Sequence, residues 1–519
     1  MKEFAYHRLL LPAAERMGDK TCVIDGDYRA TLPQHVERVF RLSQALAKDL
    51  DVNRGDRYAV MALNSHRYLE LYHASFLGAG VINPLNLRLA PKELAFILKD
   101  SGCKVCFTDF LFAGLIDSVR EEAGLERVVL LGEGTDAPHD ANYDALLAGA
   151  AAEVPDEPEE TDPVILMYTG GTTGLPKGVV IDSRALFVDG YKVGTCFPMD
   201  ERYVYLHQTP MFHAASLGAV LVVPAVGGTT TFVPVFDPAR VLEAIETQQV
   251  TMTVMVPTMI GMLLSHPEFR PERLASLKTL VYGASPMPTV LLQRVLDLFP
   301  ELDVFQGYGM TESCGLLTVL GPAEHRLGGD FLRSAGRPLL GTTLSIQDPD
   351  GDVLPAGSTG EVCARSGNYM TEYWHRPDET TDVFRGGWYH TGDAGHLDEH
   401  GYLYLVDRVK DMIVTGGENV YSAEVENAIA SHPAVEQVAV IGIPDDRWGE
   451  AVYAIVVLKA GQTATDEEIK AHARELIAGY KVPKEVEFRT EPLPLSGALK
   501  VLKRELRAPY WEGRERSVQ

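Results

Sequence analysis

Over the first 142 residues, the pattern of hydrophobic and polar residues alternates between that of helices and that of strands. Apolar side chains recur at helical spacing over residues 32–50, and an apolar run at 57–63 has the character of a buried strand. Helical spacing returns at 65–77 and 91–99. This alternation of helix and strand predicts an α/β fold built on a mostly parallel, doubly wound sheet.

A polar stretch interrupts the pattern at residues 151–163. It holds six acidic residues and three prolines, and it predicts a surface linker between subdomains. Beyond it lie helical spacing at 237–248, a β-rich run at 250–256 and a helix start at Pro257. We therefore expect a second α/β layer within one large domain spanning residues 1–407.

The C-terminal part of the chain has the pattern of a small α+β unit. Ser422 has the position of a helix N-cap, and Thr465 with Glu468 has the spacing of a capping box before a helix that runs to about residue 479. Strand patterns occupy residues 435–443, 451–457 and 485–489. We expect a separate α+β domain over residues 408–519.

Charge and cysteine content narrow the class of protein. A formal net charge of -25 over 519 residues argues against a nucleic-acid partner, and the 15 basic and 18 acidic residues from 408 onward place the acidity in the large domain. Six cysteines in so long a chain favour the reducing cytoplasm. There is no apolar run of about 18 residues and no signal-peptide pattern, so we expect no transmembrane segment. Peripheral membrane contact and a homodimer are left open.

A glycine- and threonine-rich stretch at residues 168–178 is the strongest chemical signal. Apolar runs at 164–167 and 179–181 flank it and predict a hairpin. Glycines let backbone N–H groups approach an anion, threonine hydroxyls add donors, and Lys177 supplies a point charge. The spacing differs from a Walker-A loop, because Lys177 follows Pro176 and no Ser or Thr comes next. The expected phosphate contacts are Thr169, Gly170, Gly171, Thr172, Thr173, Gly174 and Lys177.

This stretch resembles the phosphate-binding signature of the acyl-adenylate-forming superfamily, which includes acyl-CoA synthetases, luciferases and peptide-synthetase adenylation domains. Further stretches are similar to the family's motifs, and the resemblance covers roughly residues 20–507. These stretches are 281–286, 306–312, 388–393, 407–411 and 495–507.

The resemblance implies an ATP site with Mg²⁺. Tyr308 would offer a flat face to adenine, Thr311 an oxygen donor to the α-phosphate, and Glu312 a carboxylate to Mg²⁺. Asp393 and Arg408 would contact the ribose, and Thr169 would join Glu312 at the metal. The remaining implied contacts to ATP or AMP are Gly283, Ala284, Ser285, Gln306, Gly307, Gly309 and Met310.

The resemblance also implies a catalytic lysine on a mobile C-terminal lid. Lys500 takes that place and would stabilise charge as the acyl adenylate forms, with Lys503 as the alternative. Family members usually have glycine where Leu499 stands, and Leu499 would be strained if the loop needs a positive φ. Lys410 would be the hinge of the lid. Gly416 and Gly417 resemble the glycines that flank the CoA tunnel.

The acyl pocket distinguishes this chain from two groups of relatives. Amino-acid-activating domains have Asp where His213 lies, because a buried ammonium needs a carboxylate partner. His213 is therefore expected beside the path of the substrate carboxylate, with an ordinary core histidine as the alternative. Val414 replaces the second, oxidative lysine of luciferases. Other expected pocket residues, which are small, soft or apolar, are Ser216, Met255, Met259, Ser313 and Cys314.

Together these features imply an ATP-dependent carboxylic acid:CoA ligase. The acid would form acyl-AMP with release of pyrophosphate, and CoA would then displace AMP. The implied catalytic group is Thr169, Lys177, His213, Glu312 and Lys500. The expected substrate is a medium- or long-chain fatty acid or another hydrophobic acid. An aryl or cinnamate-type acid, and a stand-alone adenylating enzyme that loads an acyl carrier protein, are the alternatives.

Overall fold

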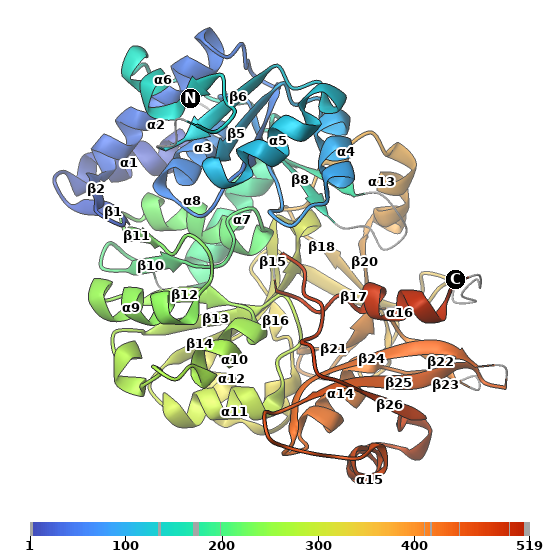
Figure 1. Cartoon of the computed structure of the whole chain (residues 1–519). Helices are drawn as coiled ribbons and strands as arrows, with labels where there is room; N and C mark the ends of the chain where they lie inside the picture. The colour runs from blue at the N-terminus through green and yellow to red at the C-terminus, as the bar shows by residue number, and fades with distance from the viewer. Residues whose placement is uncertain are drawn as a thin grey trace.

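The computed structural model of the chain describes residues 4–132, 136–169, 176–197, 199–408, 411–415, 418–445, 447–497 and 499–512, without the side chains of residues 407, 408 and 419. Figure 1 shows two large sheets stacked in the N-terminal part, with a smaller C-terminal unit in orange and red beside the lower one. The expected fold class, layered and mostly parallel sheets with helices plus a small α+β unit, is confirmed.

The upper sheet has eight strands in the described residues, in the order β19-β9-β8-β4-β3-β5-β6-β7. Neighbours from β8 to β7 are parallel, and β9 pairs antiparallel with both β8 and β19. The strands are β3 (Arg57–Met61), β4 (Val81–Pro84), β5 (Val105–Asp109), β6 (Arg127–Leu131), β7 (Ala141–Asn142), β8 (Pro163–Thr169), β9 (Lys177–Asp182) and β19 (Glu372–Tyr373). The helices of this region are α1 (His7–Met17), α2 (Leu32–Lys48), α3 (His66–Phe76), α4 (Pro91–Ser101), α5 (Phe110–Ala123) and α6 (Tyr143–Gly149).

The local hydrophobic patterns correctly predicted several of these elements. The helices expected at 32–50, 65–77 and 91–99 are α2, α3 and α4, and the hairpin around the glycine-rich stretch is formed by β8 and β9. Residues 151–163, expected to link subdomains, instead connect α6 to β8, and β7 and β8 belong to the same sheet. The stretch is mostly exposed, so its polarity reflects a surface connection within one sheet.

The lower sheet has nine strands in the described residues, in the order β16-β15-β14-β13-β12-β10-β11-β1-β2. It is parallel from β14 to β1 and antiparallel at both edges. The strands are β1 (Thr21–Asp25), β2 (Tyr28–Thr31), β10 (Val204–His207), β11 (Thr229–Phe232), β12 (Met252–Met255), β13 (Thr279–Gly283), β14 (Asp303–Met310), β15 (Gly315–Leu320) and β16 (Arg337–Pro338). The α-helices are α7 (Ser183–Cys196), α8 (Leu217–Ala225), α9 (Pro238–Gln248), α10 (Pro257–Ser265), α11 (Thr289–Leu298) and α12 (Pro322–Leu327), and the 3₁₀ turns are η1 (Ala214–Ser216), η2 (Pro271–Leu274), η3 (Thr311–Ser313) and η4 (Gly329–Arg333).

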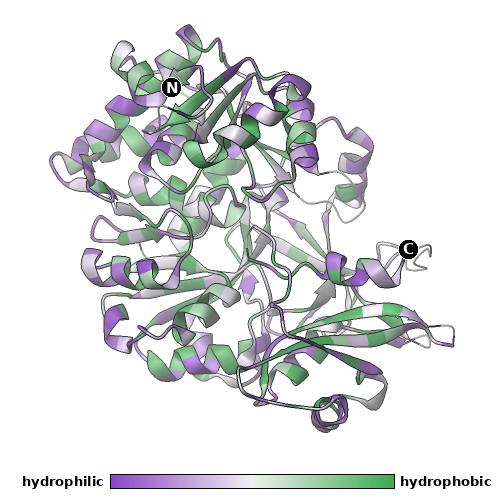
Figure 2. Ribbon diagram, in the orientation of Figure 1, coloured by the Kyte–Doolittle hydropathy of each residue, from purple (hydrophilic) through white to green (hydrophobic). Residues whose placement is uncertain are grey.

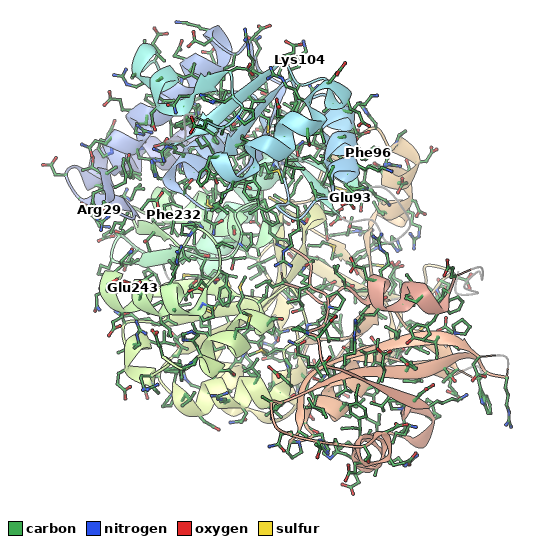
Figure 3. The ribbon with its side chains drawn as sticks, viewed as in Figure 1. Arg29, Glu93, Phe96, Lys104, Phe232 and Glu243 are labelled. Carbon is green, nitrogen blue, oxygen red and sulfur yellow. The ribbon has the colours of Figure 1, made fainter. Side chains whose placement is uncertain are left out.

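One apolar core joins the two sheets. It contains Tyr58 and Ile165 from the upper sheet and Tyr205 and Val281 from the lower one. Figure 2 shows hydrophobic residues along the strands of both sheets. In Figure 3 charged residues such as Lys104 project from the surface. Burial of this apolar area is the main force that fixes the two layers against each other.

A four-stranded antiparallel sheet completes the N-terminal part, and the sequence analysis did not anticipate it. Its order is β17-β18-β20-β21. The strands are β17 (Thr343–Gln347), β18 (Gly360–Arg365), β20 (Tyr389–Leu397) and β21 (Leu403–Arg408), with α13 (Pro377–Val383) and η5 (Arg385–Gly387) in the connection. Tyr308 of β14 packs in the same apolar cluster as Val362 and Leu403, which fixes this sheet beside the lower one.

The C-terminal unit has the expected α+β composition. A sheet of β23, β22, β25, β24 and β26 packs against α14 and α15. The elements are β22 (Ile413–Thr415), β23 (Glu418–Val420), α14 (Ser422–Ala430), β24 (Val435–Asp445), β25 (Gly449–Leu458), α15 (Asp466–Leu476), η6 (Gly479–Lys481), β26 (Glu485–Arg489), α16 (Lys503–Arg507) and η7 (Ala508–Tyr510). The capping box of Thr465 and Glu468 is confirmed. Ser422 is not the N-cap, because α14 starts at Ser422 itself and its hydroxyl accepts a hydrogen bond from Lys503 at 2.6 Å.

None of the helices in the described parts of the chain combines the length and the apolar character needed to cross a membrane.

Three histidines in α2, α3 and β10 are buried. His35 and His73 share a hydrogen bond of 2.8 Å, and His207 stacks on Phe232 with ring centroids 5.3 Å apart. Burial holds the pKa of His35 well below its usual range and lowers the pKa values of His73 and His207 to about 4 and about 3. All three imidazoles are therefore neutral in the folded protein at neutral pH.

We expect the free energy of unfolding to decrease steeply as the pH falls below about 6.5. The unfolded chain protonates these imidazoles near their ordinary pKa of 6.5, whereas the folded protein protonates His73 only near pH 4 and His207 only near pH 3, and His35 also only well below 6.5. Their stabilising contribution is thus complete above the unfolded pKa and is lost as the pH falls toward the folded pKa. Each histidine contributes a slope of about 1.4 kcal/mol per pH unit in this window. Denaturant titrations at a series of pH values measure the slope.

His207→Phe isolates one of these protonations. His207 hydrogen-bonds through neither ring nitrogen in the described residues, so phenylalanine keeps the packing and removes the titration. The slope below pH 6.5 should decrease by about 1.4 kcal/mol per pH unit. His400→Gln, at an exposed position, serves as the control and should leave the slope unchanged. An unchanged slope in His207→Phe would contradict the assignment.

Candidate active site

The expected nucleotide residues gather where β13 and β14 end. Gly283 closes β13 and is paired with Gly307 of β14. A Cβ on Gly283 would lie 2.2 Å from the Gly307 carbonyl oxygen, and one on Gly309 would lie 1.9 Å from that of Gly315. Glycine is therefore required for the strands to approach this closely, and Ala284 continues the turn after β13 with a φ of 65°. Ser285, Gln306 and Met310 lie in the same two segments.

Tyr308 and Asp393 are directly bonded. The Tyr308 hydroxyl donates to Oδ2 of Asp393 at 2.7 Å. Burial, together with the neighbouring Asp393 carboxylate, holds the pKa of Tyr308 well above its usual range, so the hydroxyl remains a donor. The backbone of Asp393 in β20 is paired with that of Arg408 in β21, whereas the side chain of Arg408 lies outside the described residues. The expected adenine and ribose residues thus form one connected group.

Glu361 holds the turn that presents Asp393. Its carboxylate lies 2.8 Å from Nδ1 of His390, 3.0 Å from a guanidinium nitrogen of Arg385 and 3.2 Å from the backbone nitrogen of Gly392. Gly392, with a φ of 70°, directly precedes Asp393. Sequence reasoning missed Glu361, because no local pattern connects it with the turn.

Glu312 lies in η3, directly after the end of β14. Its Oε1 accepts a hydrogen bond from the Tyr373 hydroxyl at 2.9 Å, and its backbone oxygen accepts one from Met370 at 2.7 Å. In the part of the chain that the structure describes, Oε2 of Glu312 has no hydrogen-bond partner. The carboxylate is thus held at one oxygen and available at the other. Thr311, the expected α-phosphate contact, precedes it in the same turn.

Lys177 is connected to this carboxylate through Tyr373. Its ammonium lies 5.1 Å from the centre of the Tyr373 ring and forms an ion pair with Glu379, whose pKa is lowered by the contact. The backbone of Lys177 is paired with that of Thr169 across the hairpin. Tyr373 and Glu379 did not appear among the expected residues. The expected contacts Gly170, Gly171, Thr172, Thr173 and Gly174 lie outside the described residues.

The loop that carries Lys500 is docked on the large N-terminal part. Arg88 donates to the backbone oxygens of Leu495 at 2.9 Å and Ser496 at 3.2 Å. Gly497 packs on Asn86 so closely that a Cβ would lie 2.2 Å from its Oδ1. Lys503, the alternative lysine, is bound instead within the C-terminal unit, where it pairs with Glu426 at 2.7 Å.

Lys500 lies close enough to His213 to affect its protonation. Nδ1 of His213 accepts a hydrogen bond from the backbone of Ala215 at 3.2 Å. Part of the residue remains accessible, yet the ring is enclosed by protein. This burial, with a smaller effect of the Lys500 ammonium, lowers the pKa of His213 to about 3. His213 is therefore a neutral hydrogen-bonding group at physiological pH, and it has no charge to offer a substrate carboxylate.

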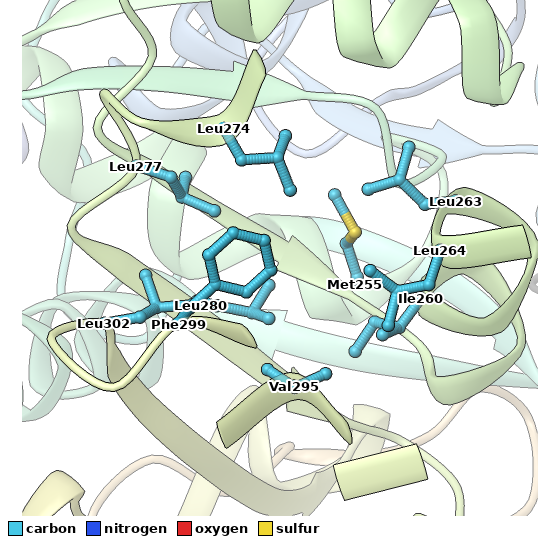
Figure 4. A pocket seen from close by; sticks show the side chains of 10 residues that line it. All are labelled: Met255, Ile260, Leu263, Leu264, Leu274, Leu277, Leu280, Val295, Phe299 and Leu302. Carbon is cyan, nitrogen blue, oxygen red and sulfur yellow. The ribbon is translucent and has the colours of Figure 1, made fainter. Parts of the chain in front are cut away.

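The other expected acyl-pocket residues are buried in three separate segments of the chain. Ser216 lies in η1, Met255 and Met259 flank the turn from β12 to α10, and Ser313 and Cys314 follow Glu312. Met255 also lines a small cavity in which every lining side chain is apolar (Figure 4). The other lining residues are Ile260, Leu263, Leu264, Leu274, Leu277, Leu280, Val295, Phe299 and Leu302.

A buried polar network supports the turn after Glu312. Asn368 donates to the Ser313 backbone oxygen at 2.7 Å and to Asp189 at 3.0 Å, and its own Oδ1 accepts from Lys192 at 2.9 Å. Burial raises the pKa of Asp189 to about 6 and lowers that of Lys192 to about 8. Asn368 is distant in sequence from Asp189 and Lys192, and none of the three belongs to a motif, so sequence reasoning missed them.

Three expected residues of the hinge and the CoA tunnel, namely Lys410, Gly416 and Gly417, lie outside the described residues.

Comparisons with known proteins agree with this arrangement. Residues 11–374 match the AMP-binding enzyme family, and residues 424–500 match the AMP-binding enzyme C-terminal domain. The chain is 40% identical over 494 residues to a feruloyl-CoA synthase of Amycolatopsis sp, which covers 94% of this chain and 96% of that relative. It is 36% identical over 487 residues to the long-chain-fatty-acid–CoA ligase FadD13 of Mycobacterium tuberculosis, with coverage of 93% and 94%.

Solved structures show the same architecture. ATP-bound MatB from Rhodopseudomonas palustris superimposes with a TM-score of 0.88 at 27% sequence identity, covering 98% of this chain and 99% of that one. The chain therefore belongs to the AMP-binding enzyme family and is an ATP-dependent, AMP-forming acyl-CoA synthetase.

Proposed function

We propose that the acid is hydrophobic, namely a medium- or long-chain fatty acid or a comparable hydrocarbon acid. The observation that supports this choice is that serine hydroxyls around the expected pocket already donate hydrogen bonds to backbone carbonyls. In the described residues, the Ser216 hydroxyl donates to the Pro210 carbonyl at 3.1 Å, and the Ser313 hydroxyl donates to that of Gly315 at 2.9 Å. Met255 and Met259 lie inside an apolar cluster. A polar substituent on the acid would lose its hydration beside these side chains without gaining a partner among them.

The cavity beside Met255 supports the same substrate class. A methionine side chain is flexible, so a modest movement of Met255 would open the cavity to a hydrocarbon chain. The apolar lining would then stabilise each added methylene by about 0.8 kcal/mol.

The nucleotide would bind between the hairpin and the ends of β13 and β14. We assign the phosphates to Thr169, Lys177 and Thr311, adenine to the face of Tyr308, and the ribose to Asp393 with Arg408. Lys177 would exchange Glu379 for a phosphate oxygen, since the triphosphate carries more negative charge than one carboxylate. The substrate carboxylate then attacks the α-phosphate beside Lys500, pyrophosphate leaves, and the CoA sulfur subsequently displaces AMP.

The residues present fit Mg²⁺. Mg²⁺ prefers one or two carboxylates together with substrate phosphates, and Glu312 offers one oxygen without a hydrogen-bond partner in the described residues. The Thr169 hydroxyl would be a second oxygen contact. When bound, the ion would neutralise charge on the phosphates.

Turnover with a panel of acids tests the substrate class. Purified protein would be incubated with ATP, Mg²⁺, CoA and either saturated fatty acids of increasing length or hydroxycinnamates, and AMP release would be followed. We expect kcat/KM to rise by about fourfold per methylene until the pocket is full, as 0.8 kcal/mol implies. Highest activity with a hydroxycinnamate, the class suggested by the feruloyl-CoA synthase relative, would overturn the proposal. Acyl-AMP formation without thioester formation would indicate a carrier protein as acceptor.

We further propose that the chain divides into residues 1–407 and a mobile lid over residues 408–519, with Lys410 as the hinge and Gly416 and Gly417 beside the CoA tunnel. The neighbouring elements support a boundary here, because β21 belongs to the four-stranded sheet and β22 to the C-terminal sheet. Arg507 and Asp411, 3.3 Å apart, join the start of the lid to its last α-helix.

Limited proteolysis should cut first between about residues 407 and 417, because few contacts cross a boundary that rotates. ATP with a fatty acid should change the cleavage rate by favouring one lid position. Fragment masses identify the site. Resistance at this junction, with cuts only at other places, would contradict a mobile lid.

A further inference from the structure

Leu499, which directly precedes Lys500, has an unusual backbone conformation. Its φ is 58°, in the left-handed region that a bulky side chain rarely adopts. The conformation is fixed by the turn itself, because the Leu499 nitrogen donates to the Ser496 oxygen at 2.9 Å and the Lys500 nitrogen to the Ser496 hydroxyl at 3.1 Å. Any shift of Leu499 would therefore be passed on to Lys500.

The Leu499 side chain contacts the large N-terminal part of the molecule. It is half-buried and packs against the apolar cluster of the lower sheet, which includes Leu206, Met255 and Met259. Among the described residues, Arg88 and Asn86 also contact this loop, and these contacts are polar or involve its backbone. Leu499 thus supplies an apolar contact between the lysine loop and the layer that holds the expected acyl pocket.

We propose that Leu499 is a positioning residue that fastens the Lys500 loop for acyl-AMP formation, its apolar contact offsetting the unfavourable backbone conformation. This inference rests on the function proposed above. The contact connects the C-terminal unit to the N-terminal part, so it must break when the lid rotates for the thioester step. Leu499 therefore acts on the first half-reaction and not on the second.

Four substitutions separate packing from backbone strain. Leu499→Gly and Leu499→Asn accept a positive φ but remove the apolar contact. Leu499→Ala keeps the backbone strain and removes the apolar contact. Leu499→Met keeps the backbone strain and the apolar contact. If packing positions Lys500, the Gly, Asn and Ala variants should each slow acyl-AMP formation by roughly tenfold. This is the rate loss expected when the apolar contact of a half-buried leucine is removed. Leu499→Met should stay within about threefold of the natural protein, since swaps of similar volume are tolerated best.

The two half-reactions are measured separately in the full-length protein, the first as ATP-dependent acyl-AMP formation and the second as thioester formation from supplied acyl-AMP and CoA. Thioester formation should be unchanged in all four variants. Hydrogen exchange provides a readout that does not depend on activity: amides of the loop at residues 495–501 should exchange faster in Leu499→Ala than in Leu499→Met.

Two outcomes overturn the inference. Faster acyl-AMP formation in the Gly and Asn variants would show that strain at Leu499 limits the enzyme and that its side chain does not position the loop. Equal loss in both half-reactions would show general damage to the fold. Failure of the proposed substrate class is recognised separately in the natural protein, which would then be most active with a hydroxycinnamate, and the four variants can be compared with that acid.

Discussion

Lys500→Ala is expected to slow acyl-AMP formation by about 10²–10³, the usual loss when one preorganised charge-stabilising group is removed from an active site. The structure places the lysine loop on the large N-terminal part, where the Lys500 ammonium helps to lower the pKa of His213. Its charge thus acts on His213, the residue expected beside the path of the substrate carboxylate. Thioester formation from supplied acyl-AMP and CoA should be nearly unchanged, because in the proposed scheme the lid rotates before this step and moves Lys500 away from the site. Single-turnover measurements of each half-reaction test both statements.

Lys503→Ala is the matched control for this experiment. Lys503 pairs with Glu426 and donates to Ser422, both in α14, so its removal should reduce stability modestly and leave both half-reactions close to normal. If Lys503→Ala is the inactive variant, the alignment of the lysine motif is wrong by three residues. If Lys500→Ala blocks both half-reactions equally, lid rotation does not separate them.

Elements whose pattern is local could be predicted from the sequence. The strand expected at 485–489 is β26 with the same bounds, and the capping box at Thr465 is present, because both depend on residues within a few positions of one another. Ser422 shows the limit of this reasoning. Its side chain could cap a helix, yet Lys503, 81 positions later, binds the hydroxyl instead. Tertiary contacts decide such cases, and local propensity does not.

The sequence could name candidate site residues but could not connect them. Tyr308 and Asp393 are bonded across 85 positions because the four-stranded sheet packs beside the lower one. Tyr373, which holds Glu312, reaches the site through the pairing of the short strand β19 with β9. A two-residue strand has no detectable period, so no sequence pattern could have revealed this connection.

Leu499 stands where family members usually have glycine, and the sequence alone indicated that this replacement could strain the loop. The expectation that a positive φ would strain this position depended on the loop conformation, and the structure gives a φ of 58° there. What the sequence could not show is that the side chain also packs on an apolar surface, since that surface is built from distant residues between Leu206 and Leu332. At Leu499 the strain thus comes from the local turn, whereas the packing comes from residues that are distant in the sequence.

Glu312→Gln is expected to reduce turnover at least about 10²-fold, or about 2.7 kcal/mol of activation free energy, while the fold stays intact. The substitution keeps the side-chain volume and an oxygen that can accept from Tyr373, so only the negative charge offered to Mg²⁺ is lost. The Mg²⁺ concentration that gives half-maximal rate should rise in parallel, which a purely structural defect would not cause. Glu243→Gln, the same exchange at an exposed position of α9, should leave turnover, Mg²⁺ dependence and Tm unchanged. Turnover of Glu312→Gln within about threefold of the natural protein, under about 0.7 kcal/mol, would show that Glu312 does not bind the metal.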